Sequence, residues 1–229
     1  MLIFADKRIP DASLEKLAAF DELIPFETEG IVYESISGHP DVFMAQLEKQ
    51  VIIAPNLPDF YKQKLREEKI DFTEGEFPVR KKHPETAGYN VVFKDNRLFH
   101  NFRYTDPSIT KIAEDAELIH LNQAYTRCSL IALGNDRFIS SDHGVERILQ
   151  RYQFEVLYVD PAEIILPGQK HGFIGGCCGL HGNRIFFTGS LKHLRDGENV
   201  RSFCRDAAYE IIELSDAPLF DGGSILFLE

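Results

Sequence analysis

The sequence lacks any apolar run that approaches the ~20 residues needed to cross a bilayer as a helix. It also lacks the basic segment and cleavage site of a secretory signal, and residues 1–5 (MLIFA) have the pattern of a strand instead. No linker, low-complexity tract or coiled-coil repeat divides the chain. We therefore expect a protein without membrane segments, folded as a single domain over residues 1–229.

Positive charge and cysteine are both scarce. The 25 Lys and Arg residues are outnumbered by 36 Asp and Glu residues, which gives a net charge of −11. This argues against a broad nucleic-acid interface, because a phosphate backbone needs a basic footprint. A cationic small-molecule partner is compatible with the charge, although solubility also explains it. The four cysteines, two of them adjacent, do not form the pattern of a disulfide framework. A reducing cytoplasmic location is the expectation.

What the sequence does contain is a repeat with a period of about 50 residues. Three segments share an apolar run, a turn with Asn followed by Arg, and a second apolar run: residues 90–101, 128–141 and 175–189. Because Asn, Asp and Gly tolerate the left-handed backbone of tight turns, each segment predicts a β-hairpin. Residues 41–55 form a weaker fourth copy without the glycine.

Each predicted hairpin is followed by a helix pattern and then by a short β-rich run. The helix patterns cover residues 59–69, 105–116, 141–149 and 195–209. The runs after them are residues 70–73, 117–121, 155–159 and 209–214. A fifth copy is split between the termini, with its first strand at 223–229, its second at 1–5, its helix from residue 10 and its third strand at 22–26.

The fold class that follows is α/β: five ββαβ repeats, here called blades, arranged as a propeller-like ring with pseudo-fivefold symmetry. The last strand of the chain should pair with the first and close the ring. Such closure removes an exposed sheet edge.

Three short polar motifs stand at the same point of the repeat, where a first strand begins. They are residues 38–41 (GHPD), 125–128 (YTRC) and 221–224 (DGGS). Asn90 occupies the equivalent position of another repeat. Equivalent positions of a closed ring converge on its axis, so we expect these side chains to meet there.

A five-bladed ββαβ ring with these motifs resembles the pentein fold of guanidine-modifying enzymes, which include arginine and agmatine deiminases, dimethylarginine dimethylaminohydrolases and amidinotransferases. Residues 38–41 resemble the family's His-x-Asp motif, residues 127–129 its cysteine motif and residues 221–224 its Glu-Gly-Gly-Asp motif. The family order is usually carboxylate, histidine, cysteine, and here it is histidine, cysteine, carboxylate. A circular permutation reconciles the two orders. The chain also resembles an uncharacterised bacterial branch of this fold.

The resemblance implies a cysteine-dependent hydrolase or amidinotransferase acting on a small cationic guanidino or amidino compound. Cys128 would attack the guanidinium carbon, His39 would transfer protons, and Asp221 would pair with the cation. No cofactor is implied. Oligomeric state, substrate identity and the choice between hydrolysis and transfer stay open.

Four further residues are expected to bind substrate or support the site. Asp41 would orient His39 or contact the substrate, Asn90 would hydrogen-bond a ligand, and Arg127, or Arg103, would bind a substrate carboxylate. Ser224 stands where the family commonly has a second acid, and Asp221 is one methylene shorter than the usual Glu. Both departures weaken the bidentate grip that two carboxylates have on a guanidinium.

Two other sites, a dinucleotide-binding loop and a zinc site, are suggested by residues 171–181 but lack the required pattern. Residues 172–179 are glycine-rich, but a dinucleotide loop needs a helix after it and a strand pattern follows instead. The set His171, Cys177, Cys178 and His181 has no common zinc spacing, so no metal site is expected. Cys177 or Cys178 is the rival nucleophile if either faces the axis.

A second function class remains open. A non-catalytic pentein would act as a binding or assembly protein, as the ribosomal anti-association factor of archaea and eukaryotes does. The enzyme hypothesis requires the sulfur of Cys128 and a ring nitrogen of His39 in one pocket, with a carboxylate within salt-bridge reach. A Cys128 sealed in an apolar core would favour the binding protein.

Overall fold

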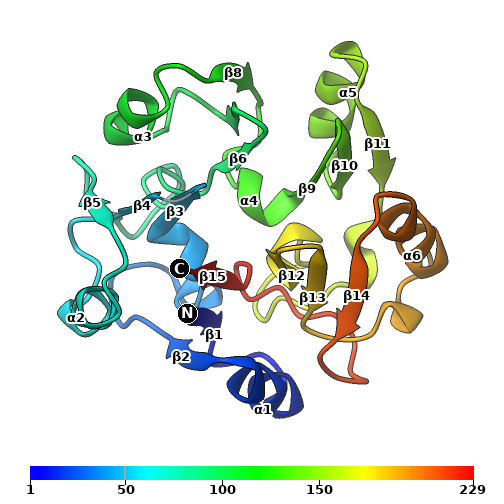
Figure 1. The fold of residues 1–229 in the computed structure, drawn as a ribbon, viewed down its shortest axis with the longest axis horizontal. Coiled ribbons are helices and arrows are strands. Elements are labelled where there is room, and N and C mark those ends of the chain that lie inside the picture. The colour runs from blue at the N-terminus through cyan, green and yellow to red at the C-terminus, as the bar shows by residue number, and fades with distance from the viewer. Residues whose placement is uncertain (49) are drawn as a thin grey trace.

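The computed structural model describes residues 1–48 and 50–229. It contains five three-stranded sheets arranged around a ring (Figure 1). In every sheet the first strand pairs antiparallel with the second, and the second pairs parallel with the third, which is the ββαβ arrangement expected from the repeat.

The first, second and third strands of the five sheets are β15 (Leu226–Leu228), β1 (Leu2–Asp6) and β2 (Glu22–Phe26); β3 (Met44–Leu47), β4 (Gln50–Ile53) and β5 (Phe72–Glu74); β6 (Val92–Lys94), β7 (Arg97–His100) and β8 (Glu117–His120); β9 (Leu130–Gly134), β10 (Arg137–Ser140) and β11 (Glu155–Tyr158); β12 (Cys178–His181), β13 (Arg184–Phe187) and β14 (Glu210–Glu213).

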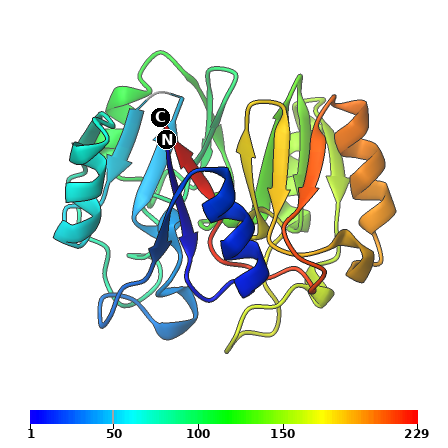
Figure 2. The ribbon, with the colours of Figure 1, turned by 60° about the horizontal axis from the view of Figure 1, so that its bottom comes forward.

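One helix joins the second strand of each sheet to the third. These are α1 (Asp11–Phe20), α2 (Asp59–Glu67), α3 (Pro107–Ile112), α5 (His143–Arg151) and α6 (Gly197–Asp206). Asp106 caps α3 through the backbone N–H of Ser108, and Asp142 caps α5 through those of Gly144 and Val145. The helices lie on the outside of the ring (Figure 2), because each buries only one apolar stripe against its own sheet.

The hairpin turns have the backbone that their residues predict. Asp95 and Asn96 join β6 to β7, and Asn135 and Asp136 join β9 to β10, all four with φ between 51° and 59°. Two successive residues with positive φ match the right-handed twist of the paired strands. Lys49, in the turn of the weaker hairpin copy, lies outside the described residues.

The ring is closed by the two ends of the chain. Leu2 pairs with Leu228 and Phe4 with Leu226, so β15 is the first strand of the sheet that β1 and β2 complete. Both strands are buried, and the termini lie side by side in both views (Figures 1 and 2). The expected split repeat is confirmed.

The first strands face the axis of the ring. β3 contacts β6, β6 contacts β9, and β12 contacts β15. Residues from all five first strands or their ends line an axial channel of about 270 Å³.

Short helical turns precede three of the first strands, which the sequence pattern did not predict. They are η2 (Pro40–Val42), α4 (Thr126–Ser129) and η4 (Gly175–Cys177). Cys128 therefore lies on a helical turn rather than at a strand start, and Cys177 ends a turn while Cys178 begins β12. The tight turns place the polar side chains across the end of the channel.

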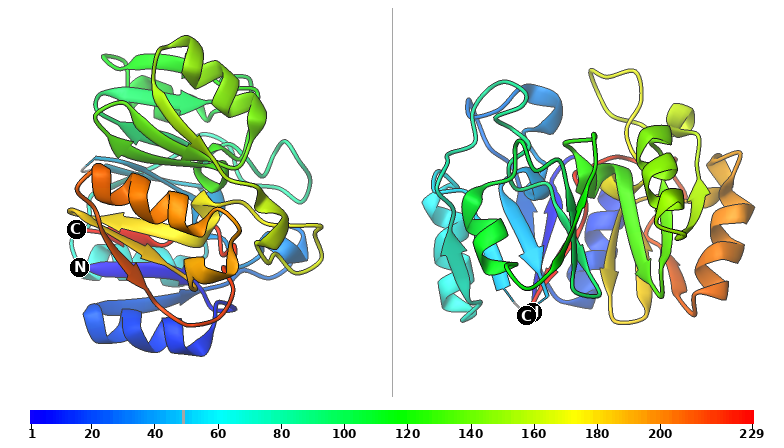
Figure 3. Two further views of the ribbon diagram at one scale, coloured as in Figure 1. Left: turned by 90° about the vertical axis from the view of Figure 1, so that its right-hand side faces the viewer. Right: turned by 90° about the horizontal axis from the view of Figure 1, so that it is seen from above.

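Three long connections lie at the end of the ring opposite the termini (Figure 3). They are residues 27–43, 75–91 and 159–177, each between a third strand and the next first strand. No helix among the described residues has both the length and the apolarity that a membrane span requires.

Candidate functional site

Cys128 is held by Asn90 from the neighbouring blade. The side-chain oxygen of Asn90 accepts the backbone N–H of Cys128 at 3.2 Å, and its Nδ2 lies 3.4 Å from the cysteine sulfur. The carbonyl of Asn90 also accepts the N–H of Arg127 at 3.1 Å. The helical turn that carries Cys128 is thus fastened to the blade before it.

Asp41 is the carboxylate beside the cysteine. The sulfur of Cys128 lies 3.1 Å from Oδ2 of Asp41, and the hydroxyl of Ser224 lies 3.1 Å from the same oxygen. Oδ1 of Asp41 is buried and has no hydrogen-bond partner in the described structure. Ser224 occupies left-handed backbone, with φ of 69°, to place this hydroxyl. Such strain is common where a site fixes a side chain.

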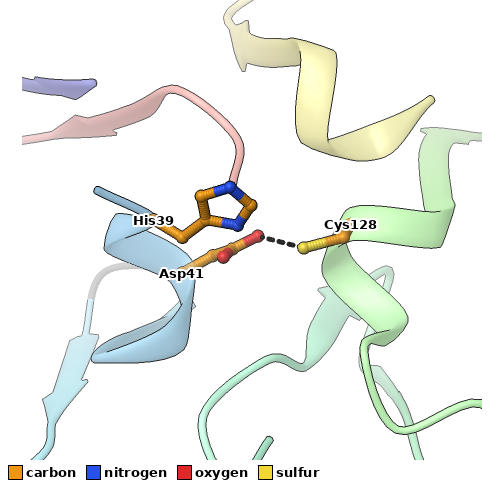
Figure 4. Close-up of side chains that lie close together, drawn as sticks. All are labelled: His39, Asp41 and Cys128. Atoms are coloured by element: carbon orange, nitrogen blue, oxygen red, sulfur yellow. Dashed lines mark hydrogen bonds between the residues drawn. The ribbon is translucent and has the colours of Figure 1, made fainter. Parts of the chain in front are cut away.

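His39 completes a compact group with these two residues (Figure 4). One ligand atom each from His39, Asp41 and Cys128 lies within 4.8 Å of the others. Neither ring nitrogen of His39 has a hydrogen-bond partner in the described structure, although the side chain is only 1% exposed. Buried nitrogens and oxygens usually have a partner, so these atoms are available to a ligand that enters the site.

Asp221 approaches the group from the other side of His39. Its Oδ1 lies 4.0 Å from Nε2 of His39, within the range of an ion pair but too far for a hydrogen bond. The backbone N–H of Phe173 donates to its Oδ2 at 2.8 Å, and that of Gly223 donates to its Oδ1 at 3.1 Å. Asp221 is therefore firmly oriented, and part of its accepting capacity is used by the backbone.

Glycines make this crowding possible. A Cβ placed on Gly176 would lie 1.9 Å from Oδ1 of Asp221, and one on Gly223 would lie 2.3 Å from Cβ of His39. At Gly176 the missing side chain lets the backbone lie directly against the carboxyl of Asp221.

A cavity of about 310 Å³ opens onto the group. Cys128, His39 and Asp221 line its inner end, while Tyr33, Tyr125 and Phe173 line its walls. Asp41, Asn90 and Ser224 are not part of this lining, but Asp41 and Asn90 contact the sulfur of Cys128 directly, and Ser224 contacts Asp41. The cysteine is 3% exposed but faces this cavity rather than a sealed core.

Burial governs the protonation of the group. It raises the pKa of the Cys128 thiol well above its usual value, and the charges of Asp41 and Asp221 raise it further. Burial also raises the pKa of Asp41 to about 6, and the contact with Cys128 opposes that rise. The pKa of His39 is lowered by burial, against the pull of Asp221. Without a bound cation, the group at neutral pH thus holds a neutral thiol and a neutral imidazole.

Not every residue predicted for the site lies in it. Arg127 lines the axial channel on the other side of the Asp41 group, and Arg103 is exposed away from the cavity lining. Cys177 and Cys178 belong to an apolar cluster, and neither lines the cavity. Their sulfurs contact backbone carbonyls, those of Phe173 and Gly175.

Metal-capable side chains come together at one place in residues 1–48 and 50–229: His39, Asp41 and Cys128. Nitrogen, oxygen and sulfur ligands of this kind suit zinc. The same three groups are equally the parts of a thiol nucleophile with its proton carrier. The set His171, Cys177, Cys178 and His181 does not form such a group among the described residues.

Sequence patterns did not identify the residues that shape the cavity. Tyr33 comes from residues 27–43, and Lys170 and Phe173 come from residues 159–177. These connections have no periodicity. The available signal was their length, since long loops in compact folds are often functional.

Several solved structures share this fold at low sequence identity. A dimethylarginine dimethylaminohydrolase (DDAH) from Pseudomonas aeruginosa complexed with citrulline matches with a TM-score of 0.52 and 11% identity, over 94% of this chain and 92% of that one. An amidinotransferase from Microseira wollei, from the saxitoxin biosynthetic pathway, matches with a TM-score of 0.54 and 10% identity, over 92% and 87%. An agmatine deiminase from C. jejuni matches with a TM-score of 0.53 and 10% identity, over 90% and 75%.

These similarities show the fold, which is the five-bladed pentein fold. Among curated proteins no sequence matches the chain. The profile of one sequence family matches residues 4–226, nearly the whole chain. The protein therefore belongs to the family of unknown function DUF6873.

Proposed function

We propose that the protein is a cysteine-dependent enzyme that cleaves a guanidino or amidino small molecule, by hydrolysis or by transfer of the amidino group. The observation that carries the proposal is the grouping of Cys128, His39 and Asp41 within 4.8 Å, with Cys128 and His39 lining the inner end of a cavity. The similar solved structures are named as enzymes of guanidino compounds, which agrees with the proposal.

The buried atoms of His39 and Asp41 that lack a hydrogen-bond partner among the described residues indicate the charge and the hydrogen-bonding groups of a ligand that fits. Oδ1 of Asp41 is an acceptor without a donor, and both nitrogens of His39 are free among the described residues. Asp221 adds a second buried carboxyl at the inner end of the cavity. A flat cation with several N–H donors satisfies these groups together, and a neutral apolar ligand does not.

Binding of the cation also activates the thiol. The carboxylates of Asp41 and Asp221 disfavour a thiolate at Cys128. A guanidinium placed between them cancels that repulsion, so the thiol can lose its proton to the neutral imidazole of His39.

The first half of the reaction uses this single proton. The thiolate of Cys128 attacks the guanidinium carbon, and a carbon–sulfur bond forms. His39 returns the proton to the departing nitrogen, the carbon–nitrogen bond breaks, and ammonia or an amine leaves. A covalent amidino-thioether on Cys128 remains, with the positive charge of the substrate.

The second half removes the amidino group. Neutral His39 takes a proton from water, the resulting hydroxide attacks the same carbon, and the carbon–sulfur bond breaks. The thiol is restored, a urea is released, and one proton passes to solvent. If an amine replaces water, the amidino group is transferred instead.

A binding protein without catalysis is the second candidate. The pKa of the resting thiol, raised well above its usual value, and the use of both Asp221 oxygens by backbone N–H groups favour it. The enzyme and the binding protein differ in whether a cation binds beside Cys128 and activates its thiol.

The test is alkylation of the intact protein with two small reagents, after which mass spectrometry identifies the modified cysteines. The cationic 2-chloroacetamidine mimics a guanidinium, and chloroacetamide is its neutral counterpart. The enzyme proposal expects rapid labelling of Cys128 by the cation, with loss of that preference in His39→Ala and Asp221→Asn. Asp115→Asn, at an exposed carboxylate, is the matched control. Slow labelling of all four cysteines at equal rates would support the binding protein.

A further inference from the structure

The candidate cavity has charged residues at both ends. Asp221 and His39 lie at its inner end beside Cys128, and Lys170 and His171 lie at its rim. Ile36, whose side chain is apolar, lines the wall between them with the aromatic rings already described. A ligand that spans the cavity therefore meets the carboxylate of Asp221 at one end, apolar surface along its length, and an ammonium group at the other end.

Lys170 is available for a ligand. The lysines that form ion pairs in the described part of the chain are Lys7, Lys62, Lys64 and Lys192, and Lys170 is not among them. Among the described residues that line the cavity, Asp221 is the only carboxylate, so Lys170 has no acidic partner there.

The segment that carries Lys170 is fixed at both ends. Nε2 of Gln169 donates a hydrogen bond to the hydroxyl of Ser35 at 3.0 Å, and the N–H of Gly172 donates to the carbonyl of Ile164 at 2.9 Å. Lys170 lies between these two anchors, so its backbone position is defined even though its side chain is exposed.

The same segment sets the distance between the two charged ends. A Cβ on Gly172 would lie 2.4 Å from Cβ of Asp221, so the backbone there touches the inner carboxyl. Lys170 is two residues away, and two residues span at most about 7 Å of chain. The backbone of Lys170 is therefore close to Asp221, and its flexible side chain, which lines the same cavity, can bring the ammonium group to the far end of a short ligand.

We infer that the site takes short ω-guanidino carboxylates, in which an apolar chain separates the guanidinium from a carboxylate, and that Lys170 binds the carboxylate. This inference rests on the proposed function, because it assumes that the guanidinium lies at Asp41 and Asp221. It concerns the far end of the substrate, where the proposed chemistry does not act.

Two related ligand classes fit less well. A guanidine with a terminal amine, such as agmatine, carries a second cation to Lys170, which has no carboxylate neighbour in the lining to balance it. An amino acid such as arginine offers the carboxylate but also an α-ammonium group. That group would lose water without gaining a carboxylate partner, because Asp221 is the only carboxylate among the described residues of the lining and is already paired with the guanidinium.

The test is calorimetric titration of Cys128→Ser protein, in which no turnover occurs, with matched ligands. 4-Guanidinobutyrate, butylguanidine and agmatine differ in the charge of the tail: negative, neutral and positive. We expect affinity to fall in that order. An ion pair at an exposed rim changes affinity by about two- to fivefold, and salt should reduce the differences. The pair 5-guanidinopentanoate and arginine tests the α-ammonium group in the same way.

Lys170→Glu should reverse the order of 4-guanidinobutyrate and agmatine and leave butylguanidine unchanged. Lys111→Glu, an equal charge change at an exposed lysine in the last turn of α3, is the control and should leave the order as it is. Equal binding of all three tails, or equal effects of the two variants, would overturn the inference while leaving the proposed function in place. Failure of every guanidine, butylguanidine included, to bind would overturn both.

Discussion

The thiol of Cys128 donates a hydrogen bond to Oδ2 of Asp41 over 3.1 Å, and both side chains are almost completely buried. The two residues come from different blades and meet only because the ring closes around its axis. A carboxylate beside a thiol opposes loss of the thiol proton, since two negative charges would then share one buried site. The rate at which Cys128 reacts with an alkylating reagent therefore reports the net negative charge beside its thiol.

Asp41→Asn should make Cys128 more reactive toward a neutral reagent. The substitution removes a nearby negative charge, one of the causes that raise the pKa of the thiol, and keeps a hydrogen-bond acceptor of the same size. Each unit by which the pKa falls increases the thiolate fraction about tenfold. The rate of labelling by chloroacetamide at about pH 8 should rise several-fold, while the preference for 2-chloroacetamidine falls. An unchanged or slower neutral reaction would contradict the assigned charge of Asp41.

The same substitution should stabilise the fold at neutral pH. The pKa of Asp41 is raised by burial to about 6 in the folded state, and an unfolded Asp titrates near 4. Between these values the folded state holds a proton that the unfolded state has lost, so stability from this group decreases as pH rises.

Urea unfolding of both proteins at several pH values checks this sign. The gain in unfolding free energy of Asp41→Asn should be near zero below about pH 4 and reach on the order of 3 kcal/mol above about pH 7. A gain that instead grows toward acidic pH would show that Asp41 is ionised and stabilised in the fold.

Asn90→Ala should weaken both the fold and the site. It removes the side-chain acceptor for the N–H of Cys128 and the donor that faces the sulfur and the carbonyl of Asp41. Leaving these buried groups unpaired costs about 1–3 kcal/mol. The pKa of Cys128 should also rise, because the Asn90 contact lowers it.

Urea unfolding and the rate of 2-chloroacetamidine labelling measure the two effects of Asn90→Ala. The control is Asn122→Ala at an exposed asparagine, where neither quantity should change. Normal stability and normal labelling in Asn90→Ala would remove Asn90 from the site.

Gly176→Ala should disturb Asp221 in particular. The added Cβ would lie 1.9 Å from Oδ1 of Asp221, so the carboxylate has to move. Gly182→Ala is a useful comparison, because nothing lies within 4 Å of that position and its φ of 58° costs only about 1 kcal/mol for alanine. We expect Gly176→Ala to lose the cation preference in Cys128 labelling and Gly182→Ala to keep it. The same preference in both variants would show that Asp221 does not select the cation.

The sequence determined the repeat, because hairpins, amphipathic helices and tight turns are local structures with local signals. Asp95 and Asn96 adopt the left-handed backbone that their types favour, and α5, capped by Asp142, forms where the pattern predicted a helix over residues 141–149. The split fifth blade was also readable, since residues 1–5 and 223–229 each have half of a motif that elsewhere is continuous.

The position of each polar motif within the repeat also predicted that the motifs meet on the axis of the ring, but it did not define their contacts. Residues 38–41, 125–128 and 221–224 meet there as predicted. The helical turn at Thr126–Ser129 directs Cys128 toward the candidate cavity. Arg127, the residue before it, lines the axial channel instead. A difference of one residue in a tight turn decides this, and repeat periodicity is too coarse to resolve it.

What only the tertiary structure decided is the chemistry of the group. Burial and the proximity of two carboxyls determine that the resting thiol of Cys128 is protonated, although Asp41 lies 87 residues away from it in the chain. The same holds for Lys170, which reaches the cavity on a connection without a pattern. Desolvation and charge interactions depend on distance in space, and in a closed ring that distance is fixed by blades that are far apart in the sequence.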